Sequence, residues 1–90
     1  MNVKNRNICV YCASTDHIPR LYIDSAKKLG RMMASNGYRL VYGGGNNGLM
    51  GIIAHEIHEH GGQVTGVITR QFVDMGFAYD DADEMIITEN

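Results

Sequence analysis

The chain has 90 residues, of which 44% are hydrophobic and 20% charged, a composition typical of one small folded domain over residues 1–90 rather than of a disordered chain. Its 8 basic and 10 acidic residues give a net charge of −2 with no basic patch, which argues against nucleic acid as a partner. The apolar runs are too short to cross a bilayer or to form a secretory signal, so we expect a cytoplasmic protein with no membrane partner.

The first half of the chain alternates between strand-like and helix-like patterns. Residues 8–12, Ile-Cys-Val-Tyr-Cys, form a continuous apolar run that predicts a strand buried on both faces of a parallel sheet. Over residues 19–35, apolar side chains recur every three or four positions, which predicts a helix that the Asn-Gly pair at 36–37 ends. Residues 38–42 are rich in β-branched and aromatic side chains and predict a second strand.

The second half continues this alternation. A helical stripe predicts a second helix over about residues 47–60, and two glycines at 61–62 end it. A third strand is expected at 63–68, a loop or weak helix at 72–83, and a short fourth strand at 85–88. The order β-α-β-α-β plus a final strand predicts an α/β fold, a Rossmann-like, doubly wound parallel sheet in three layers.

One face of the predicted sheet has no helix to pack against it. If the first three strands lie in the order 3-2-1, both helices fall on one face, because both crossovers have the same hand. No other segment of the 90 residues is long and periodic enough to cover the second face. We therefore expect the leading part of a larger doubly wound domain, or a sheet completed by another chain.

A glycine-rich turn joins the second strand to the second helix. Gly43, Gly44, Gly45 and Gly48 allow positive φ and close approach of a ligand, and the helix start that follows attracts anions such as phosphate. Their spacing also fits G-x-G-x-x-G, but they follow the second strand rather than the first, and no acidic residue ends the next strand. A phosphate site is favoured over a dinucleotide site, with a plain tight turn as the alternative, and no cofactor is expected.

Four segments carry a family resemblance. They resemble the N-terminal half of the LONELY GUY (LOG) family, whose members are often mislabelled as lysine decarboxylases. The segments are 8–14, 40–45, 48–51 and 66–68. The resemblance implies a dimeric Rossmann-like protein that hydrolyses the N-glycosidic bond of AMP-like nucleoside 5′-monophosphates, including cytokinin nucleotides, to the base and ribose 5-phosphate. It also implies that Ser14, the turn from Gly43 to Gly48 and the polar Asn47 line the nucleotide site.

Two family segments are not among the 90 residues. Family enzymes continue with Met-His-x-Arg-Lys and then Pro-Gly-Gly-x-Gly-Thr-x-x-Glu, whose arginine and glutamate are thought to carry the chemistry. We therefore assign no catalytic residue and expect this chain to be the nucleotide-binding half of a phosphoribohydrolase. The alternative is a truncated, non-catalytic module that binds a nucleotide or a protein. Expected partners are a nucleoside 5′-monophosphate and either a second copy or a complementing chain.

Two further patterns are interpreted as structural. Cys9 and Cys12 lie too far apart within one extended strand to form a disulfide and are expected to be buried packing residues. The histidines of the segment 55–60, His-Glu-Ile-His-Glu-His, do not have the spacing of a zinc-protease helix. His55, His58 and Glu59 fall opposite the apolar stripe, so we expect a solvated face and no metal site. The acidic residues between 80 and 84 are likewise expected to form a solvated loop.

Overall fold

The computed structural model describes residues 6–10 and 18–89. Both long helices and the last three strands lie where the sequence predicts them. The segment 72–83, expected to be a loop or weak helix, begins within a short helix over residues 70–74 and is a loop from residue 75 on. The elements are β1 (Asn7–Cys9), α1 (Arg20–Ser35), β2 (Arg39–Tyr42), α2 (Gly48–Glu59), β3 (Gln63–Thr69), α3 (Arg70–Asp74) and β4 (Glu84–Thr88).

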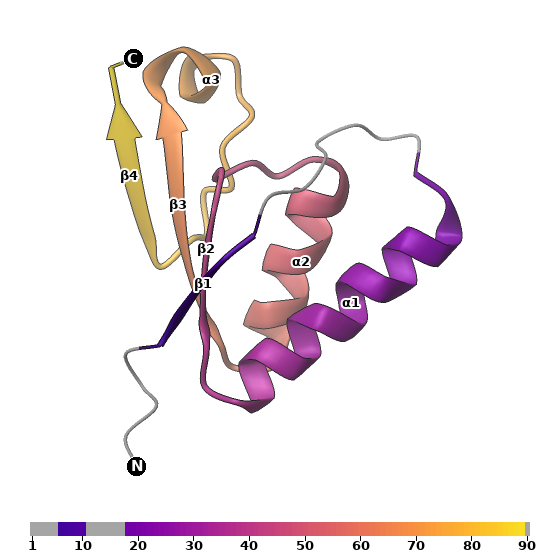
Figure 1. Cartoon of the computed structure of the whole chain (residues 1–90). Coiled ribbons are helices and arrows are strands. Elements are labelled where there is room, and N and C mark those ends of the chain that lie inside the picture. Colours follow the sequence, from indigo (N-terminus) through magenta and orange to yellow (C-terminus); the bar gives the residue numbers. More distant parts are fainter. Residues whose placement is uncertain (1–5, 11–17, 90) are drawn as a thin grey trace.

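The four strands form one parallel sheet in the order β1-β2-β3-β4. Leu40 of β2 lies opposite Ile8 on one side and Val64 on the other, which fixes the register. Helices α1 and α2 pack on the same face of this sheet (Figure 1). This is the arrangement expected when successive parallel crossovers share one hand. The predicted α/β, Rossmann-like architecture is therefore confirmed.

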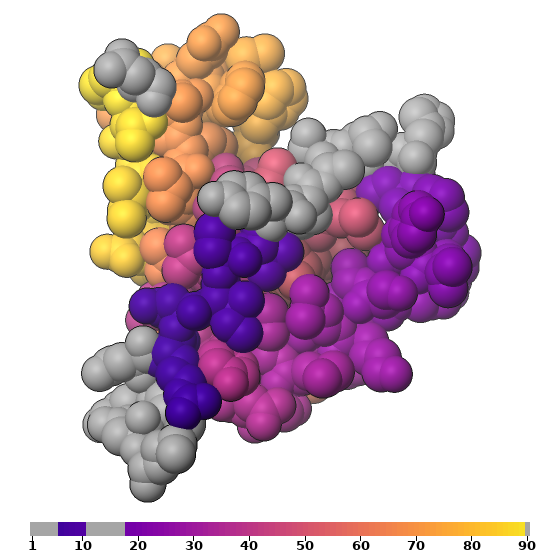
Figure 2. Space-filling view, viewed as in Figure 1, coloured from indigo at the N-terminus to yellow at the C-terminus, as the bar shows by residue number. Residues whose placement is uncertain are grey.

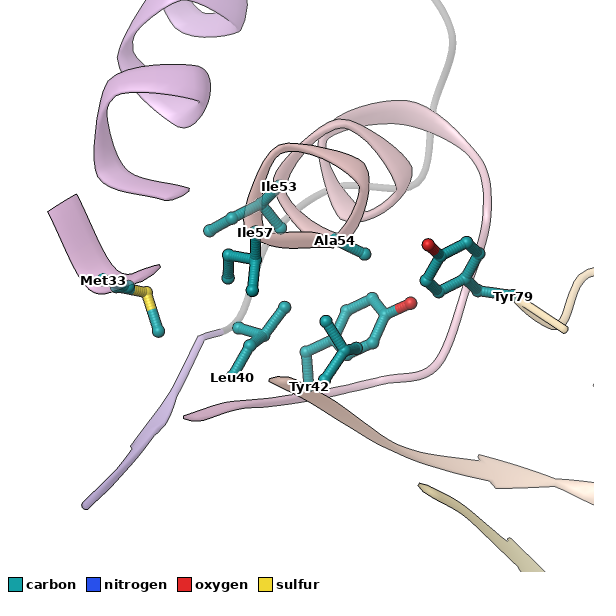
Figure 3. Packing of buried hydrophobic residues seen from close by; sticks show 8 residues of the cluster. Met33, Leu40, Tyr42, Ile53, Ala54, Ile57 and Tyr79 are labelled. Atoms are coloured by element: carbon teal, nitrogen blue, oxygen red, sulfur yellow. The ribbon is translucent and has the colours of Figure 1, made fainter. Parts of the chain in front are cut away.

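The core lies between α2 and the sheet. Ile53 and Ile57 from α2 meet Leu40 and Val64 from the two central strands, and all four side chains are at most 1% exposed (Figure 3). The apolar stripe of α2 and the alternation of β2 thus face each other as their periods require. Burial of such side chains contributes about 1.5–3 kcal/mol each to the free energy of folding, so this layer anchors the turn between β2 and α2.

The opposite face of the sheet carries no helix among the described residues. Cys9 lies beside Val41 in the register, Val67 lies beside Ile86, and the side chains of Val67 and Ile86 are 40% and 45% exposed. The prediction of a first strand buried on both faces is wrong for the described part of β1. β1 is an edge strand at the surface (Figure 2), and Cys9 is exposed rather than a buried packing residue. Cys12 lies outside the described residues.

Helix α1 is covered only along its second half. Met33 is 2% exposed, whereas Leu21 and Tyr22 near the start are 71% and 57% exposed. Figure 1 shows this end of α1 reaching away from the sheet. The predicted stripe is therefore buried at its C-terminal end only. Within residues 6–10 and 18–89, no helix has the length and apolar character needed to cross a bilayer.

Candidate functional site

The glycine turn is shaped by two residues with positive φ. Gly44 has φ +77° and Gly48, the first residue of α2, has φ +60°, a region that L side chains rarely adopt. A Cβ at Gly44 would also come within 3.1 Å of the Ile68 Cβ atom in β3. Between them, the Gly45 carbonyl accepts a hydrogen bond of 2.8 Å from the buried Tyr42 hydroxyl. The Tyr42 side chain of β2 thus holds the turn at Gly45.

A second segment, the loop 75–83, lies across this turn. The Tyr79 N–H donates to the Gly44 carbonyl at 2.8 Å, and the Asn46 N–H donates to the Phe77 carbonyl at 3.0 Å. Gly45 forms an isolated antiparallel bridge with Ala78 between these two bonds. The backbone of the loop is therefore pinned directly to the backbone of the glycine turn.

A pocket of about 340 Å³ opens where these two segments meet, at the carboxyl ends of β2 and β3. Glycines and a polar side chain form one part of its lining, and apolar side chains form the rest. The lining residues are Gly43, Gly45, Asn47, Met50, Ile68, Phe72 and Phe77. Open α/β sheets bind ligands beyond the carboxyl ends of their strands, and small-molecule sites start at about 300 Å³. The position and size of the pocket both fit a small ligand.

The glycine side of the pocket suits an anion. Gly43 and Gly45 present backbone without side chains, and α2 starts beside them with the positive end of its dipole. Asn47 is the N-cap residue of α2, yet its side chain makes no capping hydrogen bond. Its carboxamide can therefore bond a ligand. None of the described residues that line the pocket is charged, so the backbone N–H groups at the helix start would supply the attraction for an anion.

The predicted site residues fall into three groups. Gly43, Gly45 and Asn47 line the pocket, as the preceding geometry describes. Gly44 and Gly48 do not line it; they set the course of the turn through their positive φ. Ser14 lies outside the described residues. The role of all six residues in binding stays a prediction.

The apolar lining of the pocket was not predicted. Ile68 ends the third predicted strand, so the rule on carboxyl ends could have placed the residues that follow it, including Phe72, at this edge. Phe77 comes after a turn at Gly76 with φ +83°, and no local pattern indicates that the chain returns to the glycine turn there.

The histidines of α2 hold the same loop. His58 Nε2 lies 2.8 Å from Asp83 Oδ2, and His58 Nδ1 is hydrogen-bonded to the Tyr79 hydroxyl. The ring of His55 packs on Tyr79 with the ring centroids 4.8 Å apart, and its Nε2 lies 3.0 Å from Asn46 Oδ1. The prediction of a solvated face is therefore wrong for His58, which is half-buried, because the loop 75–83 packs over this side of α2.

Asp83 is the charged member of this network. Its Oδ2 also accepts the backbone N–H of Val64 at 2.7 Å, so Asp83 is not part of a merely solvated acidic loop. Burial acts to raise the pKa of Asp83, but the hydrogen bonds from His58 and Val64 and the charge of Arg39 outweigh it and leave the pKa below its ordinary value. Burial, together with Asp81 and Asp83, raises the pKa of the Tyr79 hydroxyl.

We expect Asp83→Ala to lower the free energy of unfolding by about 1–2 kcal/mol, because it leaves the buried Val64 N–H without its acceptor. The loss should be largest at neutral pH. The folded-state pKa of Asp83 lies below the ordinary value of 3.8, so the stability it contributes is present above that pH and is lost as the pH falls through the folded-state pKa. Urea denaturation of both proteins, at about pH 7 and about pH 3, measures this difference.

The exposed neighbour Asp81 provides the control for this prediction. Asp81→Ala removes a nearby carboxylate but leaves the hydrogen bond from the Val64 N–H to Asp83 in place, so we expect it to change the unfolding midpoint little. An Asp83→Ala effect that is equal at the two pH values would contradict the assignment of the stability to the ionised carboxylate.

Comparisons with known proteins find a family and several relatives for this chain. The model of the SLOG cluster4 family matches residues 5–89. The chain is 44% identical over 68 residues to the cytokinin riboside 5′-monophosphate phosphoribohydrolase LOG of Oryza sativa subsp. japonica, covering 76% of this chain and 28% of that protein. It is 37% identical over 86 residues to LOG5 of Arabidopsis thaliana, covering 93% and 38% of the two chains. It is 38% identical over 82 residues to the enzyme of that name from Mycobacterium marinum, covering 91% and 43%.

A solved structure shares the fold. The X-ray structure of TM1055 superposes with a TM-score of 0.66 at 21% identity, covering 91% of this chain and 45% of that one. At this identity the likeness extends to the fold alone. The chain thus spans between 28% and 43% of the length of the three enzymes it matches, and it corresponds to a part of each.

Proposed function

Since the chain belongs to the SLOG cluster4 family, we propose that it forms the nucleotide-binding part of a LOG-like nucleoside 5′-monophosphate phosphoribohydrolase. The reaction is hydrolysis of the N-glycosidic bond of AMP or a cytokinin nucleotide, which releases the base and ribose 5-phosphate. The names of the relatives support the reaction. The observation that carries the proposal for this chain is the pocket that Gly43, Gly45 and Asn47 line at the carboxyl ends of β2 and β3.

Each predicted residue has a role in this proposal. The 5′-phosphate binds against the backbone of Gly43 and Gly45, where the start of α2 supplies N–H groups and a partial positive charge. Asn47 bonds a phosphate or ribose oxygen through its carboxamide, and Ser14 is the second polar contact. Gly44 and Gly48 contribute through their positive φ angles, which allow the backbone conformation of the turn. No cofactor takes part in this hydrolysis.

The contribution of these residues is binding rather than bond cleavage. Cleavage develops positive charge on the ribose ring, which a carboxylate stabilises while it also activates water. No carboxylate lines the pocket among the described residues. Glu56 instead lies beside Arg31 and His60, Glu89 pairs with Arg70, and Glu84 is exposed at the start of β4. The arginine and glutamate of the family's later segments are the groups that would supply the chemistry.

A second candidate function is a module that binds a nucleotide or a protein without catalysis. The uncovered face of the sheet, with Val67 and Ile86 exposed, favours it, because such a face buries its apolar side chains only against another chain or segment. A second copy or a complementing chain could cover this face equally well in the phosphoribohydrolase. Catalytic turnover therefore distinguishes the two candidate functions, whereas binding of a nucleotide does not.

Calorimetric titration with AMP and with adenosine tests the proposal. We expect AMP to bind at least about 10-fold more tightly than adenosine, because only AMP places an anion at the glycine turn. We also expect no release of adenine from AMP by these 90 residues alone. Equal affinity for the two ligands would refute the phosphate site, and adenine release would show that a carboxylate of this chain has been wrongly discounted.

A further inference from the structure

The pocket has an aromatic wall that the phosphate site does not use. Phe72 from α3 and Phe77 from the loop 75–83 line it together with Ile68 and Met50. The two phenyl side chains are 47% and 39% exposed, although both are large and apolar. They also lie outside the buried core cluster, so packing of the core does not explain them.

The two rings lie next to each other and form one surface, and they do not face each other across a gap. Their centroids are 6.1 Å apart and their planes are inclined by 49°. A flat ring held between two phenyl rings needs about 3.5 Å on each side, or about 7 Å between parallel planes. The observed rings are closer together than this and strongly inclined, so they leave no space for a flat ring between them. A flat ligand would therefore stack on one ring and meet the other with its edge.

The wall is fixed in place relative to the glycine turn. The carbonyl of Phe77 accepts the Asn46 N–H at 3.0 Å, and the bridge between Gly45 and Ala78 follows directly. The backbone of Phe77 is thus hydrogen-bonded to the glycine turn, which is the proposed phosphate site. An anion at Gly45 and a flat apolar group at Phe77 are accommodated in one pocket of about 340 Å³.

We propose that Phe72 and Phe77 bind the base of the nucleotide by stacking, so that these two side chains supply the affinity for the base. The inference rests on the proposed function, because it takes the glycine turn as the phosphate end of the pocket. Every base offers a flat face to an aromatic ring, and the two-ring purines offer the larger one. No charged side chain of the described lining competes for this wall.

The test compares the binding of two ligands, AMP and ribose 5-phosphate, to the wild-type chain and to variants of the wall. We expect Phe77→Ala to weaken binding of AMP about 10-fold or more, the range known for loss of a base-stacking ring. Binding of ribose 5-phosphate, which lacks the base, should not change. Phe77→Tyr keeps a ring and should retain the affinity for AMP. Phe72→Ala and the double alanine variant show how the two rings share the base.

A matched control removes an aromatic side chain elsewhere. Tyr22 on α1 is 57% exposed and does not line this pocket, so Tyr22→Ala should leave AMP affinity unchanged. Unchanged AMP affinity in the double alanine variant of the wall would overturn the inference and leave the proposed function standing. An equal loss for AMP and ribose 5-phosphate would also overturn it, since the rings would then only shape the pocket. A wild-type chain that binds neither ligand would refute the proposed function and this inference with it.

Discussion

Replacing Gly51 with alanine should lower the free energy of unfolding by about 3 kcal/mol or more, a large share of the total for a chain of this size. A Cβ at Gly51 would lie 2.2 Å from the Asn46 carbonyl oxygen and 2.7 Å from its carbonyl carbon. Both are backbone atoms, so no side-chain rotation relieves the overlap. Asn46 is itself held by the hydrogen bond from its N–H to the Phe77 carbonyl, so its displacement also breaks the contact between turn and loop.

Urea denaturation followed by circular dichroism measures this loss, with Gly61→Ala as the matched variant. Gly61 has φ +79° and open space around its added Cβ, so alanine there costs backbone strain alone, about 1–2 kcal/mol. Gly51 lies within α2 and has no positive φ, so its cost is the steric overlap alone. If Gly51→Ala is no more destabilising than Gly61→Ala, the turn is softer than its contacts indicate.

The sheet and its helices could be predicted because their signals are local. The stripe through Ile53 and Ile57 has the period of a helix, and both side chains are buried against the sheet. The residue types of 38–42 predict a strand, and in the structure β2 alternates in burial with Leu40 in the core. The rule on crossover handedness, applied to the strand order 3-2-1, predicts both helices on one face of the sheet. What could not be read from β1 was that it is not covered on both faces, because an apolar run looks the same in a covered strand and in an uncovered one.

The loop over the glycine turn could not be predicted because its signals are not local. Tyr79 bonds to Gly44 and Asp83 bonds to His58, and neither pair is close in sequence. The helical period of α2 correctly places His58 away from the apolar stripe, but that face is covered by a segment with no regular pattern. Three of the predicted site residues do line the pocket. They could be predicted because the strand, the glycines and the helix start are consecutive in the sequence, so one short segment determines their arrangement.

Gly45→Asp should weaken AMP binding at least about 100-fold, which corresponds to a loss of about 2.7 kcal/mol in the free energy of binding. Gly45 lines the pocket, and its added Cβ would meet first the flexible end of Met50, at 3.0 Å from Cε. The carboxylate then extends into the space proposed for the phosphate. Two like charges about 4 Å apart repel by several kcal/mol near a protein surface, where the effective dielectric constant is about 20.

Calorimetric titration with AMP measures the effect, and two further variants separate charge from bulk. Gly45→Ala adds the Cβ without the carboxylate, so it should lose far less affinity than Gly45→Asp. Gly43→Asp places the same charge at an exposed glycine of the same lining, where the carboxylate stays hydrated and folding is retained. Because both aspartates point at one anion, both should abolish tight binding of AMP. If Gly43→Asp folds and binds AMP as the wild type does, the phosphate does not lie at the glycine turn, and the pocket must hold the nucleotide in another orientation or not at all.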